Sequence, residues 1–246
     1  MTQRLTSNSE TKAVIPASLR EEVDVHMHDG EGRTALHYAA TVGYERVVQI
    51  LLDANAEIDR QDDDGLTALH CAAGRGHVSV VHTLVDAVAD VDKQDNDGET
   101  ALHRVAYRGL DRVVQILVDA KAEVDKEDNQ GATALHWAAS CGYDRVVRIL
   151  VDIKAEIDKP DHVHGQTALH RAAVRGHDRV VRILVDAKAE VDKEDDDGYT
   201  ALQHAAIMGH DRVVHIFVDA KAEVEKGDNH GYMALHCEAP WRGGKD

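Results

Sequence analysis

The tetrapeptide Thr-Ala-Leu-His recurs along this chain at an almost constant interval. It begins at residues 34, 67, 100, 133 and 167, and the variants Thr-Ala-Leu-Gln and Met-Ala-Leu-His begin at residues 200 and 233. The interval is 33 residues everywhere except between the fourth and fifth copies, where it is 34. A unit of this length cannot bury an apolar face alone, so the period predicts an array in which each unit stacks on its neighbours.

Each unit has the pattern helix, short turn, helix, extended loop. The Thr can cap the first helix through its hydroxyl, and a Gly follows about nine residues later, where a helix ends with a left-handed residue. The second segment carries an apolar stripe such as Val146, Val147, Leu150 and Val151, which lies on one helical face. A polar, acid-rich stretch with turn residues then leads to the next Thr. We call this stretch the finger and predict that it is hairpin-like.

The 33-residue period, the Thr-x-Leu-His-x-Ala-Ala motif, the Gly-His or Gly-Tyr pair and the Val-Val-x-Ile-Leu stripe resemble the ankyrin repeat. The resemblance covers about residues 17 to 240 and implies an all-α ankyrin-repeat solenoid. Residues 1–16 lack the pattern, so we predict a disordered tail followed by a single domain over residues 17–246. Its opening residues 17–28 resemble the end of a degenerate unit. The six complete repeats and one partial repeat are expected at 29–61, 62–94, 95–127, 128–160, 161–194, 195–227 and 228–246.

The chain departs from the family pattern after each second helix, where ankyrin repeats usually have Gly. That position holds Asn55, Val88 or one of four lysines, Lys121, Lys154, Lys188 and Lys221. If the position is left-handed, β-branched Val88 is the least suitable of these residues. We therefore expect the array to be less stable than one with Gly throughout.

Charge is divided between the fingers and the rest of the chain. The formal net charge is −17, and 32 of the 45 acidic residues lie in the six fingers. Such acidity argues against binding to nucleic acid, which relies on clustered Lys and Arg. No apolar run is long enough to cross a membrane. Cys71, Cys141 and Cys237 cannot all pair with one another, which favours a reducing compartment, the cytoplasm or the nucleus.

The resemblance implies that the first helix of each repeat lines a concave face. The side chains that point into it are expected four, seven and eight residues after the Thr, and we call these the +4, +7 and +8 positions. Arg, Trp and Tyr are the residues that most often dominate binding interfaces. The candidate partner-binding residues are Arg75, Arg104, Tyr107, Arg108, Trp137, Cys141, Arg171, Arg175, His204 and Met208. The competing interpretation is a solvated helix face that was copied by duplication.

The finger tips form a second candidate surface. Acidic tips should attract a partner with a basic surface and speed its association. The candidate residues are Asp63, Asp64, Asn96, Asp97, Asn129, His162, His164, Asp196 and Asp197.

The chain has 17 histidines but no recognisable catalytic, metal or cofactor motif. The motif histidines, such as His103, are implied by the resemblance to brace the neighbouring loops. His162 and His164 lack the further ligands that fix a metal ion, so no metal or cofactor is expected. The sequence thus favours a monomeric, non-enzymatic protein-interaction scaffold. The alternative is a concave pocket that binds a small anionic or aromatic ligand, and a biosynthetic enzyme is one form of this alternative.

Overall fold

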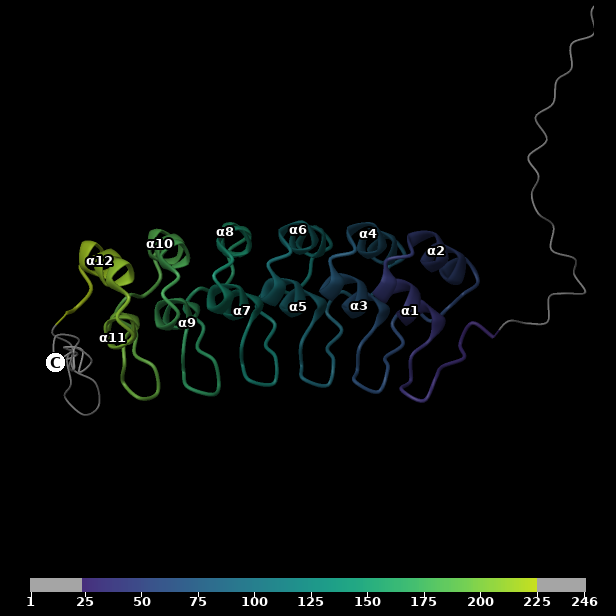
Figure 1. Ribbon diagram of the computed structural model, residues 1–246, viewed down its shortest axis with the longest axis horizontal. Helices are drawn as coiled ribbons and strands as arrows, with labels where there is room; N and C mark the ends of the chain where they lie inside the picture. The colour runs from purple at the N-terminus through teal and green to yellow at the C-terminus, as the bar shows by residue number, and fades with distance from the viewer. Residues whose placement is uncertain (1–23, 225–246) are drawn as a thin grey trace, which may run out of the picture.

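The computed structural model describes residues 24–224, and the predictions for residues 1–16 and 228–246 lie outside this range. The described residues form twelve helices in six antiparallel pairs, with isolated bridges but no strands (Figure 1). The predicted all-α array of helix pairs is confirmed. The helices are α1 (Ala35–Val42), α2 (Glu45–Asp53), α3 (Ala68–Arg75), α4 (Val78–Asp86), α5 (Ala101–Arg108), α6 (Asp111–Asp119), α7 (Ala134–Cys141), α8 (Asp144–Asp152), α9 (Ala168–Val174), α10 (Asp178–Asp186), α11 (Ala201–Ile207) and α12 (Asp211–Asp219).

The helices lie in two layers. The odd-numbered helices form the inner layer, from which the fingers project, and the even-numbered helices form the outer layer (Figure 1). Each inner helix packs on the next inner helix and on its own outer partner. Paired small residues such as Ala72 and Ala73 are fully buried and let the inner helices approach closely, while Val80, Val81 and Leu84 fill the space between layers.

Local signals fix the ends of the inner helices. Each begins at a Thr with extended backbone that forms a capping box with the residue three positions later. Beyond each helix a Gly has a left-handed φ, for example 70° at Gly109. A Cβ atom on Gly109 would lie 2.4 Å from the Tyr143 ring, so this position needs Gly for space as well as for conformation.

The motif histidines join each repeat to the next. Nδ1 of His103 accepts the backbone N–H of Thr100 at 3.1 Å, so Nε2 carries the proton and donates to the Ala132 carbonyl in the following finger at 3.1 Å. The predicted bracing role is therefore confirmed. The same bridge is made by His37, His70, His136 and His170.

Neighbouring fingers are also joined by backbone hydrogen bonds. The N–H of Asn96 donates to the Asp64 carbonyl, and the N–H of Asn129 donates to the Asp97 carbonyl. The finger before Thr167 is one residue longer than the others, since the interval there is 34 residues. It keeps this ladder because the backbone N–H of His162 donates to the Gln130 carbonyl. The fingers thus form a continuous row and not a set of independent loops.

The position after each outer helix is left-handed in all six repeats. The φ angles lie between 61° at Lys221 and 71° at Lys154 and Lys188, and Val88 has a φ of 66° with 84% of its surface exposed. The predicted loss of stability depends on a left-handed backbone at this position, and the structure has that backbone. Val88 combines a strained backbone with a side chain that gains almost no burial.

Replacing Val88 with Gly should stabilise the protein. We expect Val88→Gly to raise the free energy of unfolding by about 1 kcal/mol, because Gly adopts positive φ without a Cβ penalty. Urea denaturation monitored by circular dichroism measures the change. The control is Ala87→Gly, one residue earlier, where φ is −83° and Gly should only destabilise. A lower stability for Val88→Gly would contradict the interpretation.

The histidine bridges should make stability depend on pH. Burial lowers the pKa of His70, His136 and His170 from 6.5 to about 4. Between pH 6.5 and 4 the unfolded chain therefore binds more protons than the folded chain, and the free energy of unfolding falls as the pH is lowered. The bridges contribute fully only above about pH 6.5.

A glutamine at one bridge should reduce this dependence. The sixth repeat already uses Gln203, whose Oε1 accepts the Thr200 N–H at 2.7 Å. The free energy of unfolding should fall between pH 7 and pH 4.5 in both proteins. We expect this fall to be about 2 kcal/mol smaller in His136→Gln than in the wild type, because one titrating group is removed. Urea denaturation of both proteins at the two pH values measures the difference. Parallel stability curves for the two proteins would refute the proposed linkage.

Candidate functional site

The first feature of the concave face is an aspartate that opens each finger turn. We call Asp29, Asp62, Asp95, Asp128, Asp161 and Asp195 the turn aspartates. All except Asp29 are buried. Oδ1 of Asp95 accepts the backbone N–H groups of Asp97 at 3.0 Å and Glu99 at 2.9 Å, and the other five turn aspartates accept turn N–H groups in the same way. The carboxylate therefore determines the shape of the finger turn.

In every described repeat except the second, the other oxygen of the turn aspartate accepts a side chain from the concave face. Arg171 donates to Oδ2 of Asp161 from Nη2 at 2.9 Å and from Nε at 3.1 Å. Nε1 of Trp137 donates to Asp128 at 2.9 Å. Equivalent pairs join Arg104 to Asp95, His204 to Asp195 and Tyr38 to Asp29. In these five repeats the residue at the +4 position thus completes the turn of its own repeat.

These contacts change how the predicted concave residues are interpreted. Arg104, Trp137, Arg171 and His204 have their polar ends engaged within the protein. Their rings and stems remain available to a partner, but their charges are largely compensated. Sequence reasoning missed the pairing, although its signal was present, since an aspartate stands nine or ten residues before each donor.

Three predicted residues from consecutive repeats form one aromatic cluster. The Arg171 guanidinium lies over the Trp137 ring, 5.5 Å from its centroid. Tyr107 meets Trp137 edge to face, with ring centroids 5.6 Å apart. Tyr107 is 55% exposed, so the cluster offers an apolar surface in the middle of the array.

The arginines at the +8 position are exposed, whereas those at the +4 position are partly buried. Arg75, Arg108 and Arg175 form no ion pair with any residue in the range 24–224. Met208 is 54% exposed. The free positive charge of the concave face is thus carried by the +8 arginines.

The two described cysteines are not paired. Burial raises the pKa of the Cys71 thiol and of the Cys141 thiol, although Arg175 acts on Cys141 in the opposite direction. Neither thiol is hydrogen-bonded to His204 within the described part of the chain. These thiols therefore lack the lowered pKa of an activated nucleophile.

The concave face is hollowed over the second repeat. A cavity of about 560 Å³ lies between Tyr38 and Tyr107, where small Cys71 and Gly74 occupy the +4 and +7 positions. A neighbouring hollow of about 400 Å³ shares Gly74, Tyr107 and two arginines with it and reaches Cys141. The two hollows together form a groove lined by residues of repeats one to four.

All nine predicted finger residues are exposed. Asn96 and Asn129 also donate through Nδ2 to the carbonyls of Asp63 and Asn96, so their amides support the ladder. His162 lies 3.4 Å from Glu127. No set of three or more His, Cys, Asp or Glu side chains in residues 24–224 is placed to hold a metal ion. The other five predicted finger residues, which are also exposed, are Asp64, Asp97, His164, Asp196 and Asp197.

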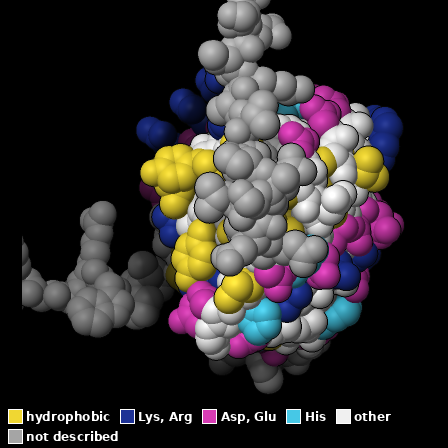
Figure 2. Space-filling model, turned by 90° about the vertical axis from the view of Figure 1, so that its right-hand side faces the viewer, with side chains coloured by type: hydrophobic (Ala, Val, Ile, Leu, Met, Phe, Trp, Pro, Cys, Tyr) yellow, Lys and Arg dark blue, Asp and Glu magenta, His cyan; other side chains and the backbone are white. Residues whose placement is uncertain are grey.

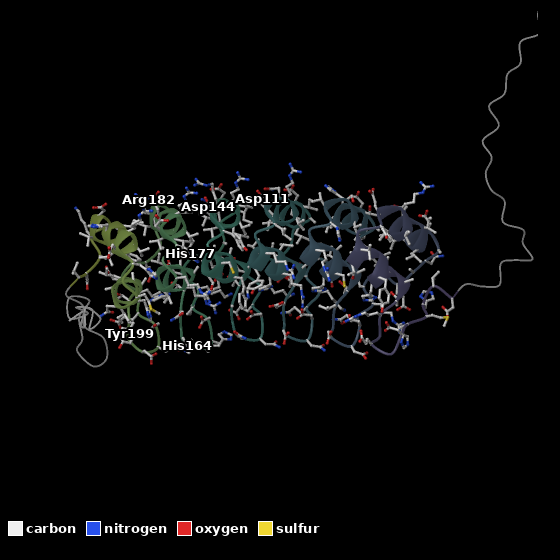
Figure 3. The ribbon with its side chains drawn as sticks, viewed as in Figure 1. Asp111, Asp144, His164, His177, Arg182 and Tyr199 are labelled. Carbon is white, nitrogen blue, oxygen red and sulfur yellow. The ribbon has the colours of Figure 1, made fainter. Side chains whose placement is uncertain are left out.

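The outer layer carries charged residues, and the N-terminal end of the array exposes hydrophobic side chains. Asp111, Asp144 and Arg182 lie on the outer layer, whereas His164 and Tyr199 lie in the fingers (Figure 3). Figure 2 shows hydrophobic side chains at the N-terminal end of the array. There Val47 is 42% exposed, whereas the equivalent Val80 is fully buried, because the described residues place no repeat before α1 and α2.

Comparisons with known proteins identify the family. The family model described as ankyrin repeats, in three copies, matches residues 6–95, 87–161 and 153–228. The chain belongs to the ankyrin repeat family. A comparison with curated proteins found no match.

Solved ankyrin structures share the fold over most of the chain. The ankyrin repeat domain of Bcl-3, a member of the IkappaB protein family, superposes with a TM-score of 0.77 at 25% identity, covering 87% of this chain and 97% of that domain. The human ASB11 ankyrin repeat domain gives 0.76 at 25% identity, with coverages of 85% and 93%. Ankyrin repeats are generally non-enzymatic modules that bind other proteins. Within residues 24–224, no helix is long and apolar enough to cross a membrane.

The structural role of the +4 position in this ankyrin array can be measured. We expect Arg104→Met to lower the free energy of unfolding by about 1–3 kcal/mol, because it leaves the buried Asp95 carboxylate without its charged donor. The control is Arg108→Met, which removes an exposed arginine from the same helix and should change stability by less than about 0.5 kcal/mol. Urea denaturation compares both variants with the wild type. Equal effects would contradict the assignment.

Proposed function

We propose that the chain is a non-enzymatic scaffold that binds a partner protein through its concave face. The observation that carries this proposal is the groove over repeats one to four, which combines exposed Tyr107 with two arginines, Arg75 and Arg108, that form no ion pair within residues 24–224. Aromatic and arginine side chains beside a hollow are the usual composition of an interface centre. The exposed acids at the finger tips add a second, oppositely charged contact region. A partner with an acidic group facing the concave arginines and basic groups facing the finger tips would match both regions.

The finer expectations belong to the same proposal. The acidic tips favour a partner with a basic surface, and the protein is expected to act as a monomer. The unpaired cysteines Cys71 and Cys141 favour the cytoplasm or the nucleus. Neither nucleic acid nor membrane is an expected partner.

Charge reversal on the concave face tests the proposal. We expect Arg75→Glu combined with Arg108→Glu to lose partners that the wild type captures from a cell extract, because these arginines are unpaired and their loss should spare the fold. The matched control is Arg148→Glu with Arg182→Glu on the outer layer, which should keep those partners. Quantitative mass spectrometry compares the three captures. Identical partner sets for all three proteins would reject the concave face as the binding surface.

Salt dependence tests the contribution of the fingers. We expect the association rate with a captured partner to fall at least several-fold between 50 and 300 mM salt, since screening weakens long-range attraction. Asp63→Asn combined with Asp64→Asn and Asp97→Asn should reduce this dependence while leaving the dissociation rate nearly unchanged. Surface plasmon resonance measures both rates. An association rate that does not respond to salt would exclude electrostatic steering by the fingers.

The cavity of about 560 Å³ supports a second candidate function, the binding of a small anionic or aromatic ligand. Its volume lies within the range of small-molecule sites, and Trp137, Tyr38 and Arg104 contribute to its lining. Screening small anionic and aromatic compounds by thermal shift, with Arg75→Glu and Arg108→Glu as the control, distinguishes this candidate. Stabilisation of the wild type alone would favour it.

A further inference from the structure

The second repeat lacks the side chain that completes its finger turn. In the other five described repeats the +4 residue donates to the turn aspartate at 2.5 to 2.9 Å. In the second repeat the +4 residue is Cys71, whose thiol is a weak donor and forms no hydrogen bond with Asp62 in the described structure. Asp62 is therefore the one described turn aspartate without a donor from its own repeat.

Arg33 of the preceding repeat replaces this donor only in part. Its Nε lies 3.4 Å from Oδ2 of Asp62, which is longer than any of the five equivalent contacts. The same guanidinium lies 2.7 Å from Glu31 and 3.9 Å from Asp64, so its charge is shared among three carboxylates. The Asp62 side chain is nevertheless only 1% exposed. A buried carboxylate with one long hydrogen bond on Oδ2 can accept a further donor.

The missing side chain leaves space as well as an acceptor whose one hydrogen bond is long. Asp62, Cys71 and Gly74 all line the cavity of about 560 Å³. In the third repeat the equivalent positions hold Arg104 and Tyr107, which occupy the corresponding space. The cavity thus lies where a donor side chain at the +4 position would lie, and it contains the aspartate oxygen that such a side chain would contact.

The other end of the cavity carries unpaired positive charge. Arg75 and Arg108 line it, are exposed, and form no ion pair within residues 24–224. Arg104 also lines it, but its charge is matched by Asp95 and Glu99. An occupant should therefore present a donor toward the finger and an acidic group toward the +8 arginines.

We infer that an arginine side chain of the partner protein enters this cavity and donates to Oδ2 of Asp62, with an acidic residue of the same segment on Arg75 and Arg108. Arginine is favoured because this chain uses it for the equivalent contact in repeats three and five. Its planar group can also stack on Tyr38 or Tyr107, which flank the cavity. This inference rests on the proposed function and specifies the partner's chemistry.

Cys71→Arg is the central variant for the test. It supplies the missing donor from the chain itself, so we expect a higher melting temperature together with loss of binding. Cys71→Leu fills the same space without a donor, and we expect it to lose binding without the gain in melting temperature. Ile207→Arg places the same new residue at an exposed +7 position of the sixth repeat, outside both hollows, and should retain binding. A lower melting temperature for Cys71→Arg with full binding retained would overturn the inference.

The probe is a phage-displayed library of random twelve-residue peptides, selected on the wild type and counter-selected on Cys71→Arg. We expect the enriched peptides to contain an arginine with an acidic residue nearby. For a synthetic enriched peptide, replacing that arginine by citrulline keeps the shape but removes the charge. We expect it to weaken binding at least about tenfold in fluorescence anisotropy. Enriched peptides without arginine, equal binding of the citrulline form, or no enrichment over Cys71→Arg would each overturn the inference.

Peptides selected on the wild type without the counter-selection separate this inference from the proposed function. Peptides that lose binding to the Arg75→Glu and Arg108→Glu protein but not to Cys71→Arg would support the concave face while overturning the arginine site. Peptides that bind all these proteins equally would count against both.

Discussion

The carboxylate of each turn aspartate, which is buried in every described repeat except the first, is the interaction on which the finger and the concave face both depend. One oxygen accepts two or three backbone N–H groups of the turn, and in every described repeat except the second the other oxygen accepts a side chain from the inner helix. A buried carboxylate needs this complete set of donors, because an unsatisfied charge is costly away from water. The requirement selects hydrogen-bond donors such as Arg104, Trp137 and His204 at the +4 position. It also couples the finger to the helix within each repeat.

This coupling divides the arginines of the inner face by role. Arg104 and Arg171 hold finger turns, whereas Arg75, Arg108 and Arg175 are exposed and carry the free charge. The motif histidines provide the complementary link between repeats, since each donates to a carbonyl of the following finger. The fingers therefore act as a rigid row, and a partner meets a preformed surface. The net charge of −17 alone conceals this arrangement.

Much of the fold could be predicted from sequence because it follows from local rules repeated at a fixed period. The Thr cap, the Gly after each inner helix and the left-handed position of Val88 each depend on a few neighbouring residues. The engagement of Arg104 by Asp95 was not predicted, because a basic residue on a helix face is ordinarily solvated. The nine-residue spacing between donor and aspartate indicates the pairing only once the finger is known to fold back on the helix. The cavity could not be predicted, because its volume depends on side chains from several repeats.

The central claim is that Asp62 lacks the donor that completes every other described finger turn. The most direct measurement is a double-mutant cycle of Cys71→Arg and Asp62→Asn, with free energies of unfolding from urea denaturation. We expect Cys71→Arg to stabilise the protein by about 1 kcal/mol or more when Asp62 is present, and we expect this gain to disappear with Asp62→Asn. An equal effect of Cys71→Arg in both backgrounds, or a destabilisation that does not depend on Asp62, would contradict it.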